Sequence, residues 1–325
     1  MAQNIEILIR VLVSLFLATL VSSLVIKLII KKEKEKHLGQ AIREDIVKTH
    51  QLKSGTPTMG GVGILIGAVT SFFINYKFIN IKTIIVLLLV SAFFMIGLID
   101  DLIKVKFKDA KGLDAKIRFL LEIALTLVSL VLLGYYEQTM WHLHFFNNYI
   151  YLGILFIPFV VLMIVGSANG VNMTDGLDGL AGGLLLLAFL PFLLIALNNQ
   201  DFALAFLITG FIGGNIGFLR YNANPAKIFM GDAGSLTNGS FLAMIAFLLN
   251  AEYLLLIAGG IFVVETISVI LQVSYYKATR KRIFKMAPLH HHFEMLGMKE
   301  YQVVNLFYLF GFICSFIALV IGGII

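Results

Sequence analysis

Ten long apolar runs occupy most of this chain, and they restrict its fold more than any other feature. A stretch of about 18–25 apolar residues can cross the hydrocarbon core of a bilayer as a helix. The backbone polar groups of a spanning segment must be hydrogen-bonded within the protein, so the runs predict an all-α polytopic integral membrane protein of about ten transmembrane helices. The runs lie near residues 7–30, 60–76, 81–99, 117–134, 149–167, 180–197, 202–219, 236–250, 253–276 and 303–325.

The composition supports this class. Of the 325 residues, 59% are hydrophobic and 14% are charged, whereas about 25% of an average soluble domain is charged. No internal repeat or low-complexity segment is visible, so we expect one transmembrane domain over residues 1–325. The single cysteine, Cys314, excludes an intrachain disulfide framework. Within the runs, Glu122 and Glu265 need polar partners, and the run at 253–276 is long enough to be broken or to protrude.

Lysine and arginine are distributed unevenly between the two sides of the predicted bundle. Of the 25 basic residues, 22 fall on one side, and only Arg10, Lys77 and Lys82 fall on the other. Because cytoplasmic loops are enriched in lysine and arginine, the basic side is predicted to be cytoplasmic and both termini extracytoplasmic. The net charge of +6 then reflects topology and attraction to anionic lipid, and no nucleic-acid partner is expected.

Five aspartates gather at the predicted cytoplasmic face. Ionisable groups next to hydrocarbon are costly, and they are kept where they bind ions or substrate. Carboxylate oxygens suit Mg²⁺, which proteins commonly bind together with substrate phosphates. The pattern predicts a cytoplasmic-facing site for a phosphorylated substrate. The five residues are Asp100, Asp101, Asp175, Asp178 and Asp232.

The segment 100–104 ends the third run. On a helix, Asp100 and Lys104 are four residues apart and share a face, which favours an ion pair. Asp101 points about 100° away from Asp100, so the two carboxylates are expected to have different partners. A charged helix end at the membrane interface is the alternative interpretation.

Two loops rich in glycine carry the other aspartates. In the segment 169–183, glycines let backbone N–H groups approach a ligand, and the helix that follows offers an N-terminus that favours phosphate. An ordinary N-cap at Asp178 is the alternative. In the segment 222–235, Asp232 lies in a Gly-Asp-x-Gly-Ser turn beside a helix start. The aromatic face of Phe229 is a candidate for stacking on a base. The alternative is an ordinary aromatic residue at the membrane interface.

Two further segments carry candidate contacts. Three consecutive histidines at 290–292 lie in a basic loop. Consecutive imidazoles point in different directions on a helix, so they are not expected to form a zinc site, and they suit hydrogen bonding at a phosphate. A helix lying on the membrane surface is the alternative for this segment. In the segment 53–63, Lys53, Thr56 and Thr58 are candidates for substrate contacts, whereas Gly61 and Gly63 are expected to permit close helix packing.

Together, these five segments resemble one enzyme family. In order along nearly the whole chain, they are similar to the phospho-N-acetylmuramoyl-pentapeptide-transferases. The aspartate motifs are shared by the wider superfamily of polyprenyl-phosphate N-acetylhexosamine-1-phosphate transferases, and the first and last segments point to the muramoyl branch. The sequence reads Lys-x-Gly-Thr-Pro-Thr-Met-Gly-Gly at 53–61, Asp-Asp-x-x-Lys at 100–104, Asn-x-x-Asn-x-Thr-Asp-Gly-Leu-Asp-Gly-Leu at 169–180, Phe-Met-Gly-Asp-x-Gly-Ser at 229–235 and Pro-Leu-His-His-His-Phe-Glu at 288–294.

The resemblance implies a function and a set of site residues. It implies a multi-pass enzyme of the bacterial inner (plasma) membrane, a homodimer with one catalytic domain per chain. With Mg²⁺, this enzyme transfers phospho-N-acetylmuramoyl-pentapeptide from UDP-N-acetylmuramoyl-pentapeptide to undecaprenyl phosphate, giving lipid I and UMP in peptidoglycan synthesis. Asp232 resembles the principal metal ligand, and Asp100 the base that deprotonates the lipid phosphate. The implied catalytic residues are Asp100, Asp101, Asp175, Asp232, His290, His291, His292 and Lys116. The implied substrate-binding residues are Lys53, Thr58, Asn172, Gly176, Asp178, Asn222, Phe229 and Gln272.

Other functions and two chemical routes stay open at this point. A transferase that uses UDP-N-acetylglucosamine would share the aspartates, and an assay with both nucleotide sugars separates the two. An ion-coupled transporter is the remote alternative, since transporters place carboxylates near the bilayer midplane and often show repeats. Within the transferase reaction, either the lipid phosphate attacks directly or an aspartate first forms a covalent intermediate, and trapping a phospho-aspartate separates these routes.

Overall fold

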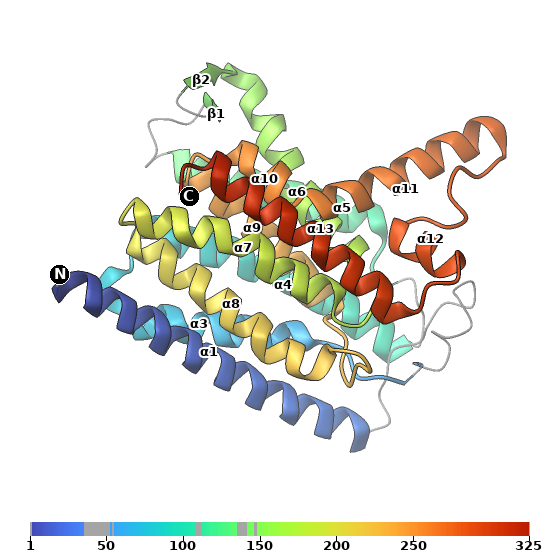
Figure 1. The fold of residues 1–325 in the computed structure, drawn as a ribbon, viewed down its shortest axis with the longest axis horizontal. Coiled ribbons are helices and arrows are strands. Elements are labelled where there is room, and N and C mark those ends of the chain that lie inside the picture. Colours follow the sequence, from blue (N-terminus) through green and yellow to red (C-terminus); the bar gives the residue numbers. More distant parts are fainter. Residues whose placement is uncertain are drawn as a thin grey trace.

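The computed structural model is a bundle of α-helices with one short hairpin (Figure 1), and it describes residues 2–35, 53, 55–107, 112–134, 142–145 and 148–324. The longer helices are α1 (Ala2–Glu35), α3 (Gly60–Ile74), α4 (Ile81–Phe107), α5 (Ala115–Gly134), α6 (Phe156–Thr174), α7 (Leu180–Asn198), α8 (Phe202–Asn222), α9 (Gly231–Leu248), α11 (Gly260–Thr279) and α13 (Glu300–Ile321). The short elements are η1 (Tyr76–Phe78), η2 (Gly153–Leu155), α10 (Glu252–Ala258), α12 (Leu289–Met295) and the antiparallel strands β1 (His142–Phe145) and β2 (Asn148–Tyr151).

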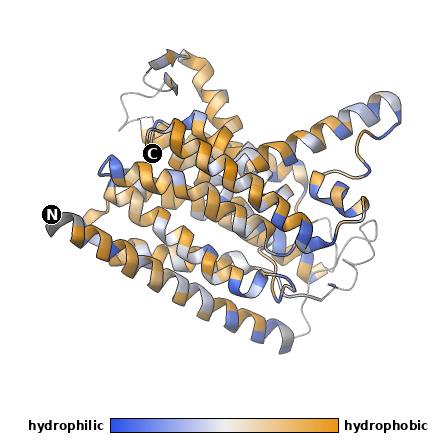
Figure 2. Cartoon of the chain, viewed as in Figure 1, coloured by the Kyte–Doolittle hydropathy of each residue, from blue (hydrophilic) through white to orange (hydrophobic). Residues whose placement is uncertain are grey.

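Eight of the described helices are long and apolar enough to cross a membrane, namely α1, α4, α5, α6, α7, α8, α11 and α13. The helix α3 is apolar but has only 15 residues. The class predicted from the apolar runs, an all-α polytopic membrane protein, is therefore confirmed. Figure 2 shows the hydrophobic residues along the length of the helices.

Each predicted run contains a helix, but the boundaries differ where polar side chains extend a helix or a strand replaces it. The helix α4 continues through Asp100 and Asp101 to Phe107. The run predicted at 149–167 is wrong by seven residues at each end, because α6 spans Phe156–Thr174. Its first residues pair with β1 instead, with Tyr151 opposite His142. At its other end, α6 continues past residue 167 to Thr174, and the Asn169 side chain within this extension donates to the Val165 carbonyl at 2.9 Å.

The run predicted at 253–276 is broken, as the sequence suggested. It divides at Gly259 into α10 and α11. Figure 1 shows α11 leaving the bundle and the chain returning through α12 to α13. Few residues of α11 are buried, and one of these is Glu265.

The helix α9 forms the centre of the bundle. Nearly all of its residues are buried, and it packs against α3, α4, α6 and α7. Its polar side chains are bonded inside the protein; for example, Asn215 of α8 donates to Asn238 at 2.7 Å. A central helix that touches protein on every side does not need the apolar surface of a lipid-facing helix. This explains why the first residues of α9, 231–240, can have small and polar side chains within a membrane bundle.

Two glycines allow the neighbouring helices to reach the start of α9. A Cβ atom on Gly61 of α3 would collide with the backbone of Gly234, and one on Gly97 of α4 would collide with the backbone of Asp232. The predicted role of Gly61 in close helix packing is confirmed. The backbone of Gly61 also donates to the Met230 carbonyl at 3.0 Å. These contacts fix Asp232 against the last turns of α4.

Candidate active site

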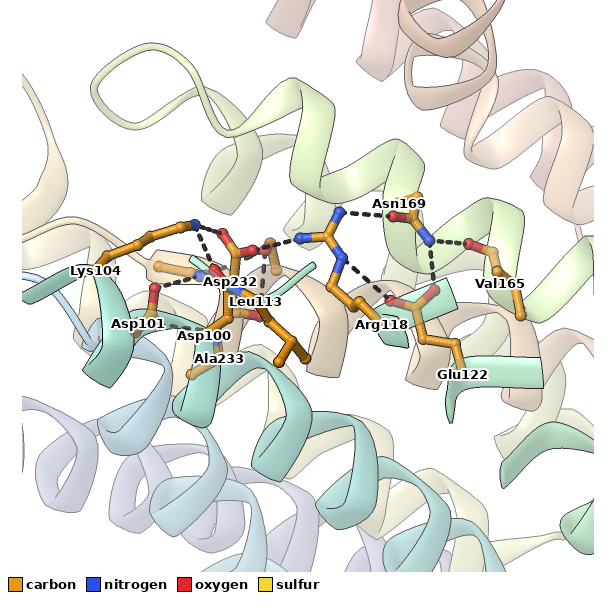
Figure 3. Close-up of polar contacts among 12 residues, drawn as sticks. Asp100, Asp101, Lys104, Leu113, Arg118, Glu122, Val165, Asn169, Asp232 and Ala233 are labelled. Carbon is orange, nitrogen blue, oxygen red and sulfur yellow. Dashed lines mark hydrogen bonds and ion pairs between the residues drawn. The ribbon is translucent and has the colours of Figure 1, made fainter. Parts of the chain in front are cut away.

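Three aspartates from two helices meet at one end of the bundle. Asp100 and Asp101 lie in the last turns of α4, and Asp232 lies in the first turn of α9. All three side chains are buried, and each offers an oxygen within 4.8 Å of the others. Figure 3 shows them together, although Asp101 and Asp232 are 131 residues apart in the chain. The structure thus brings the segments 100–104 and 222–235 to one place.

Asp101 closes the N-terminus of α9. Its Oδ1 accepts a hydrogen bond from the backbone N–H of Asp232 at 3.0 Å, and its Oδ2 accepts one from Ala233 at 3.0 Å. The first N–H groups of a helix have no partner within the helix, and the helix dipole favours a negative charge beside them. Both oxygens of Asp101 therefore hold the backbone that carries Asp232.

Asp100 has different partners, as its offset from Asp101 predicts. Its Oδ1 accepts a hydrogen bond from the backbone N–H of Leu113 at 2.7 Å. Its Oδ2 lies 2.5 Å from the Nζ atom of Lys104, one turn later on α4. The predicted ion pair between Asp100 and Lys104 is confirmed.

Two cations hold the Asp232 carboxylate. Lys104 Nζ lies 3.0 Å from Oδ1, and the Arg118 guanidinium of α5 donates to Oδ2 at 2.7 Å (Figure 3). Lys116, which the family resemblance implied as catalytic, is exposed, and its backbone N–H bonds the Asp114 side chain at 2.9 Å. In this structure Arg118 is the residue of α5 that reaches the aspartates.

The two buried glutamates inside predicted spans both have polar partners, as expected. Glu122 Oε2 accepts a hydrogen bond from Asn169 Nδ2 at 2.6 Å. Glu265 Oε1 accepts one from the backbone N–H of His290 at 3.1 Å, and its Oε2 lies 3.3 Å from His290 Nδ1. Glu265 therefore fixes the start of α12 against α11, and Glu122 links α5 to α6.

A second charged cluster lies beside the loop 175–179. Lys53 Nζ lies 2.6 Å from Asp178 Oδ1 and 2.6 Å from Glu300 Oε1 of α13. The backbone N–H of Asp178 also donates to Glu300 Oε1, at 2.7 Å. On its other oxygen, Asp178 accepts hydrogen bonds from the backbone of Ala226 at 2.9 Å and from Asn224 at 3.2 Å. The structure thus brings Lys53 and Asp178 together and adds Glu300, which the sequence did not single out.

Asn222 joins the two glycine-rich loops. Its Oδ1 accepts a hydrogen bond from the backbone of Gly179 at 2.9 Å, and its Nδ2 donates to the Ile228 carbonyl at 2.8 Å. The next residue, Phe229, is half-buried, and its N–H donates to the Pro57 carbonyl at 2.8 Å. The loop that carries Phe229 is therefore tied to both the 175–179 loop and the segment before α3.

The three histidines of α12 have different partners, which agrees with the prediction that they cannot all face one ion. His290 is buried against α11. His291 Nδ1 lies 2.8 Å from Glu294 Oε2, and His292 Nδ1 accepts a hydrogen bond from the backbone of Lys285 at 3.1 Å. The ring of His290 meets the 175–179 loop, because a Cβ atom on Gly176 would collide with its Nε2.

The remaining predicted residues lie around these clusters. Thr58 is buried, and its backbone N–H donates to Glu33 Oε2 at 3.0 Å. Asn172 is half-buried in the last turn of α6. Gln272 of α11 accepts hydrogen bonds from the backbone of residues 283 and 284 at 3.1 and 3.0 Å, so its amide holds the loop that leads to α12.

Asp175 follows α6 directly and faces the other acids. Burial, together with the charges of Asp232, Asp101 and Asp178, raises its pKa well above the ordinary value of 3.8. The folded protein therefore binds this proton more tightly than the unfolded chain does. Without a bound cation, stability should fall as the pH rises above 3.8 toward the folded pKa.

The Asp175→Asn variant tests this electrostatic cost. In EDTA at pH 8 we expect its Tm to exceed that of the wild type by about 2–4 °C, because the repelling charge is gone. The difference should shrink toward zero near pH 4. Thermal unfolding in detergent at both pH values measures it. A Tm difference that is the same at both pH values would contradict a charge-based origin.

Several residues of the site were not singled out from the sequence. Arg118 is one of them, although Glu122, which was expected to need a polar partner, lies four residues later on the same face of α5 and was a signal for it. Asn169 belongs to the motif at 169–180, but its position in the sequence did not indicate its hydrogen-bond partner. Glu300 gave no signal, because an acid in the first turn of a helix is ordinary.

An apolar groove of about 480 Å³ lies among the helices α6, α10 and α11. Met163, Gly166 and Gly170 of α6 line one wall, and Phe262 and Thr266 are among the residues on the other. Gly170 follows Asn169, which contacts Arg118. One residue that lines the groove is therefore next in sequence to a residue that contacts Arg118.

Comparison with known proteins gives consistent matches. Residues 83–250 match glycosyl transferase family 4. The chain is 43% identical over 295 residues to the phospho-N-acetylmuramoyl-pentapeptide-transferase of Staphylococcus carnosus (strain TM300), which covers 89% of this chain and 92% of that protein. It is 42% identical over 296 residues to the protein of the same name from Bacillus mycoides (strain KBAB4), covering 87% and 89% of the two chains.

Proposed function

This chain belongs to glycosyl transferase family 4 and to the phospho-N-acetylmuramoyl-pentapeptide-transferases, and from that premise we propose its reaction and the residues that perform it. It is a membrane-embedded transferase of peptidoglycan synthesis. We place it in the bacterial inner membrane as a homodimer with one catalytic domain per chain. Its ten apolar runs span the bilayer, with both termini outside and the aspartate cluster facing the cytoplasm, where the water-soluble nucleotide substrate is available.

The proposed reaction joins a nucleotide-linked sugar phosphate to a lipid phosphate. An oxygen of undecaprenyl phosphate attacks the β-phosphorus of UDP-N-acetylmuramoyl-pentapeptide, the bond from that phosphorus to the bridging oxygen breaks, and UMP leaves while lipid I forms. The observation that carries this proposal is the buried Asp100–Asp101–Asp232 cluster with its two cations at the end of membrane helices. The apolar groove along α6, α10 and α11 supports a lipid acceptor, since it offers a place for the polyprenyl chain.

The donor set fits a hard divalent cation. Its ligands are carboxylate oxygens only, which suits Mg²⁺. We assign Asp232 as the principal ligand, with Asp100 in reach. When bound, Mg²⁺ would neutralise charge on the diphosphate oxygens.

The side chains around the cluster divide the remaining tasks. Asp100 accepts the proton of the lipid phosphate, and Lys104 stays beside it to balance the charge. His290 presents its imidazole to the 175–179 loop, where it donates a hydrogen bond to a phosphate oxygen. Lys53 and Asp178 form the side of the site that we assign to the nucleotide.

The activity is tested by UMP release. Purified protein in detergent is mixed with UDP-N-acetylmuramoyl-pentapeptide and undecaprenyl phosphate, with Mg²⁺ or with EDTA. We expect UMP and lipid I only when both substrates and Mg²⁺ are present. The same assay with UDP-N-acetylglucosamine tests the alternative sugar, for which no turnover is expected. Turnover without lipid phosphate, or in EDTA, would contradict the proposal.

A further inference from the structure

Arg118 contacts three different elements through one guanidinium group. It donates to Asp232 of α9 at 2.7 Å and to Asn169 of α6 at 3.4 Å, and its Nε lies 3.7 Å from Glu122 Oε1 on its own helix (Figure 3). The contact with Asp232 is short, and the contact with Glu122 is too long for a hydrogen bond. Arg118 is therefore drawn toward Asp232 and away from its nearest anion on α5.

Glu122 has an unused acceptor on the side of Arg118. Its side chain is fully buried, and its Oε2 is occupied by Asn169. Its Oε1 accepts no hydrogen bond from the described part of the chain. A buried carboxylate oxygen without a donor is costly, and a guanidinium group that moved about 1 Å closer would satisfy it. Glu122 thus presents an unpaired carboxylate oxygen 3.7 Å from the Nε atom of Arg118.

The contacts of Lys104 differ from those of Arg118. The carboxylates that it contacts, Asp100 and Asp232, both belong to the set that would bind the cation. For Arg118, by contrast, Glu122 and Asn169 lie outside that set. Because a cation at Asp232 competes with Arg118 for the same carboxylate, the group that can withdraw without losing all its partners is Arg118.

We propose that Arg118 is a displaceable counter-ion of Asp232, and that Glu122 with Asn169 forms the position to which its guanidinium withdraws when a divalent cation binds. This inference rests on the proposed function, because it requires that Asp232 bind a metal ion. Arg118 and Glu122 are positioning residues in this scheme. Before the cation binds, the contact of Arg118 with Asp232 reduces the repulsion among the acids. After withdrawal, the guanidinium stays near the cation, where it can bind a phosphate oxygen.

Mn²⁺ binding to the full chain in detergent, without substrate, tests the proposal by electron paramagnetic resonance. Arg118→Gln should tighten Mn²⁺ binding about tenfold, because the competing cation is gone. Glu122→Gln should weaken it about threefold or more, because Arg118 then has no anion to withdraw to and stays on Asp232. The double variant should bind more tightly than Glu122→Gln alone. Lys106→Gln removes an exposed positive charge from α4 and is the control for a general charge effect.

The decisive result is that Mn²⁺ affinity rises in one single variant and falls in the other. If the two residues had only a structural role, both substitutions would change the Mn²⁺ affinity in the same direction. Equal shifts in Arg118→Gln and Lys106→Gln, or weakening in both Arg118→Gln and Glu122→Gln, would overturn the proposal. If Arg118→Gln does not fold, Glu122→Gln decides the question alone, since unchanged or tighter Mn²⁺ binding in that variant would overturn the proposal. If Asp232→Asn binds Mn²⁺ as the wild type does, the metal assignment itself fails, which is a different outcome.

Discussion

Asp232→Asn is expected to lower UMP release at least about 10³-fold while the protein stays folded. The carboxylate of Asp232 accepts hydrogen bonds from Lys104 and Arg118, and it is the assigned principal ligand of the cation. An amide has no negative charge to offer to Mg²⁺ or to these two side chains. The fold should persist because the contacts that fix the start of α9 use the backbone of residues 232 and 233, which the substitution keeps.

The matched control for this variant is Asp201→Asn. Asp201 caps α8, where its Oδ1 accepts a hydrogen bond from Leu204 at 3.1 Å. Asparagine is nearly as good an N-cap as aspartate, so this variant should keep both its Tm and its activity. UMP release is measured for both variants at saturating substrate and at several Mg²⁺ concentrations. Wild-type turnover in Asp232→Asn at any of these concentrations would contradict the assigned role.

The apolar runs predicted the helices, because burial of hydrocarbon against lipid is a property of each segment alone. The same local character explains why the Asp100–Lys104 pair could be predicted, since both residues lie on one helix. It also explains the offset of Asp101 from Asp100. Such features depend on helical periodicity and not on neighbours in space.

Other features of the site depend on which helices lie next to one another in the folded protein. The sequence alone could not specify those features. Nothing in the segment 100–104 indicated that Asp101 would bond the backbone of α9, because its partners are 131 and 132 residues away. The choice of Arg118 over Lys116 also follows from packing, since the two residues differ by about 200° around α5. The break at Gly259 was suggested only by the length of its run. The β1–β2 pairing was missed because an apolar strand and an apolar helix end look alike in a hydrophobic chain.

Asp101→Ala should remove both stability and activity, because Asp101 holds the start of the central helix. The substitution leaves two buried N–H groups, those of Asp232 and Ala233, without their acceptors. Each unsatisfied donor costs about 1–3 kcal/mol, so the two together predict a loss of about 2–6 kcal/mol in the free energy of unfolding. The first turn of α9 should loosen, and Asp232 would lose its position relative to Lys104 and Arg118. We therefore expect kcat to fall at least about 10²-fold.

Asp114→Ala provides the comparison that isolates this effect. Asp114 also bonds the first N–H groups of a helix, those of Lys116 at 2.9 Å and Ile117 at 3.3 Å, but it is exposed at the start of α5. Water can replace an exposed cap, so this variant should lose about 0.5–1 kcal/mol and keep most of its activity. Thermal unfolding and UMP release are measured for both variants. If Asp101→Ala is as stable as Asp114→Ala but inactive, Asp101 acts on substrate directly. If it is both less stable and inactive, and Asp101→Asn recovers part of each property, Asp101 acts by holding α9 in place.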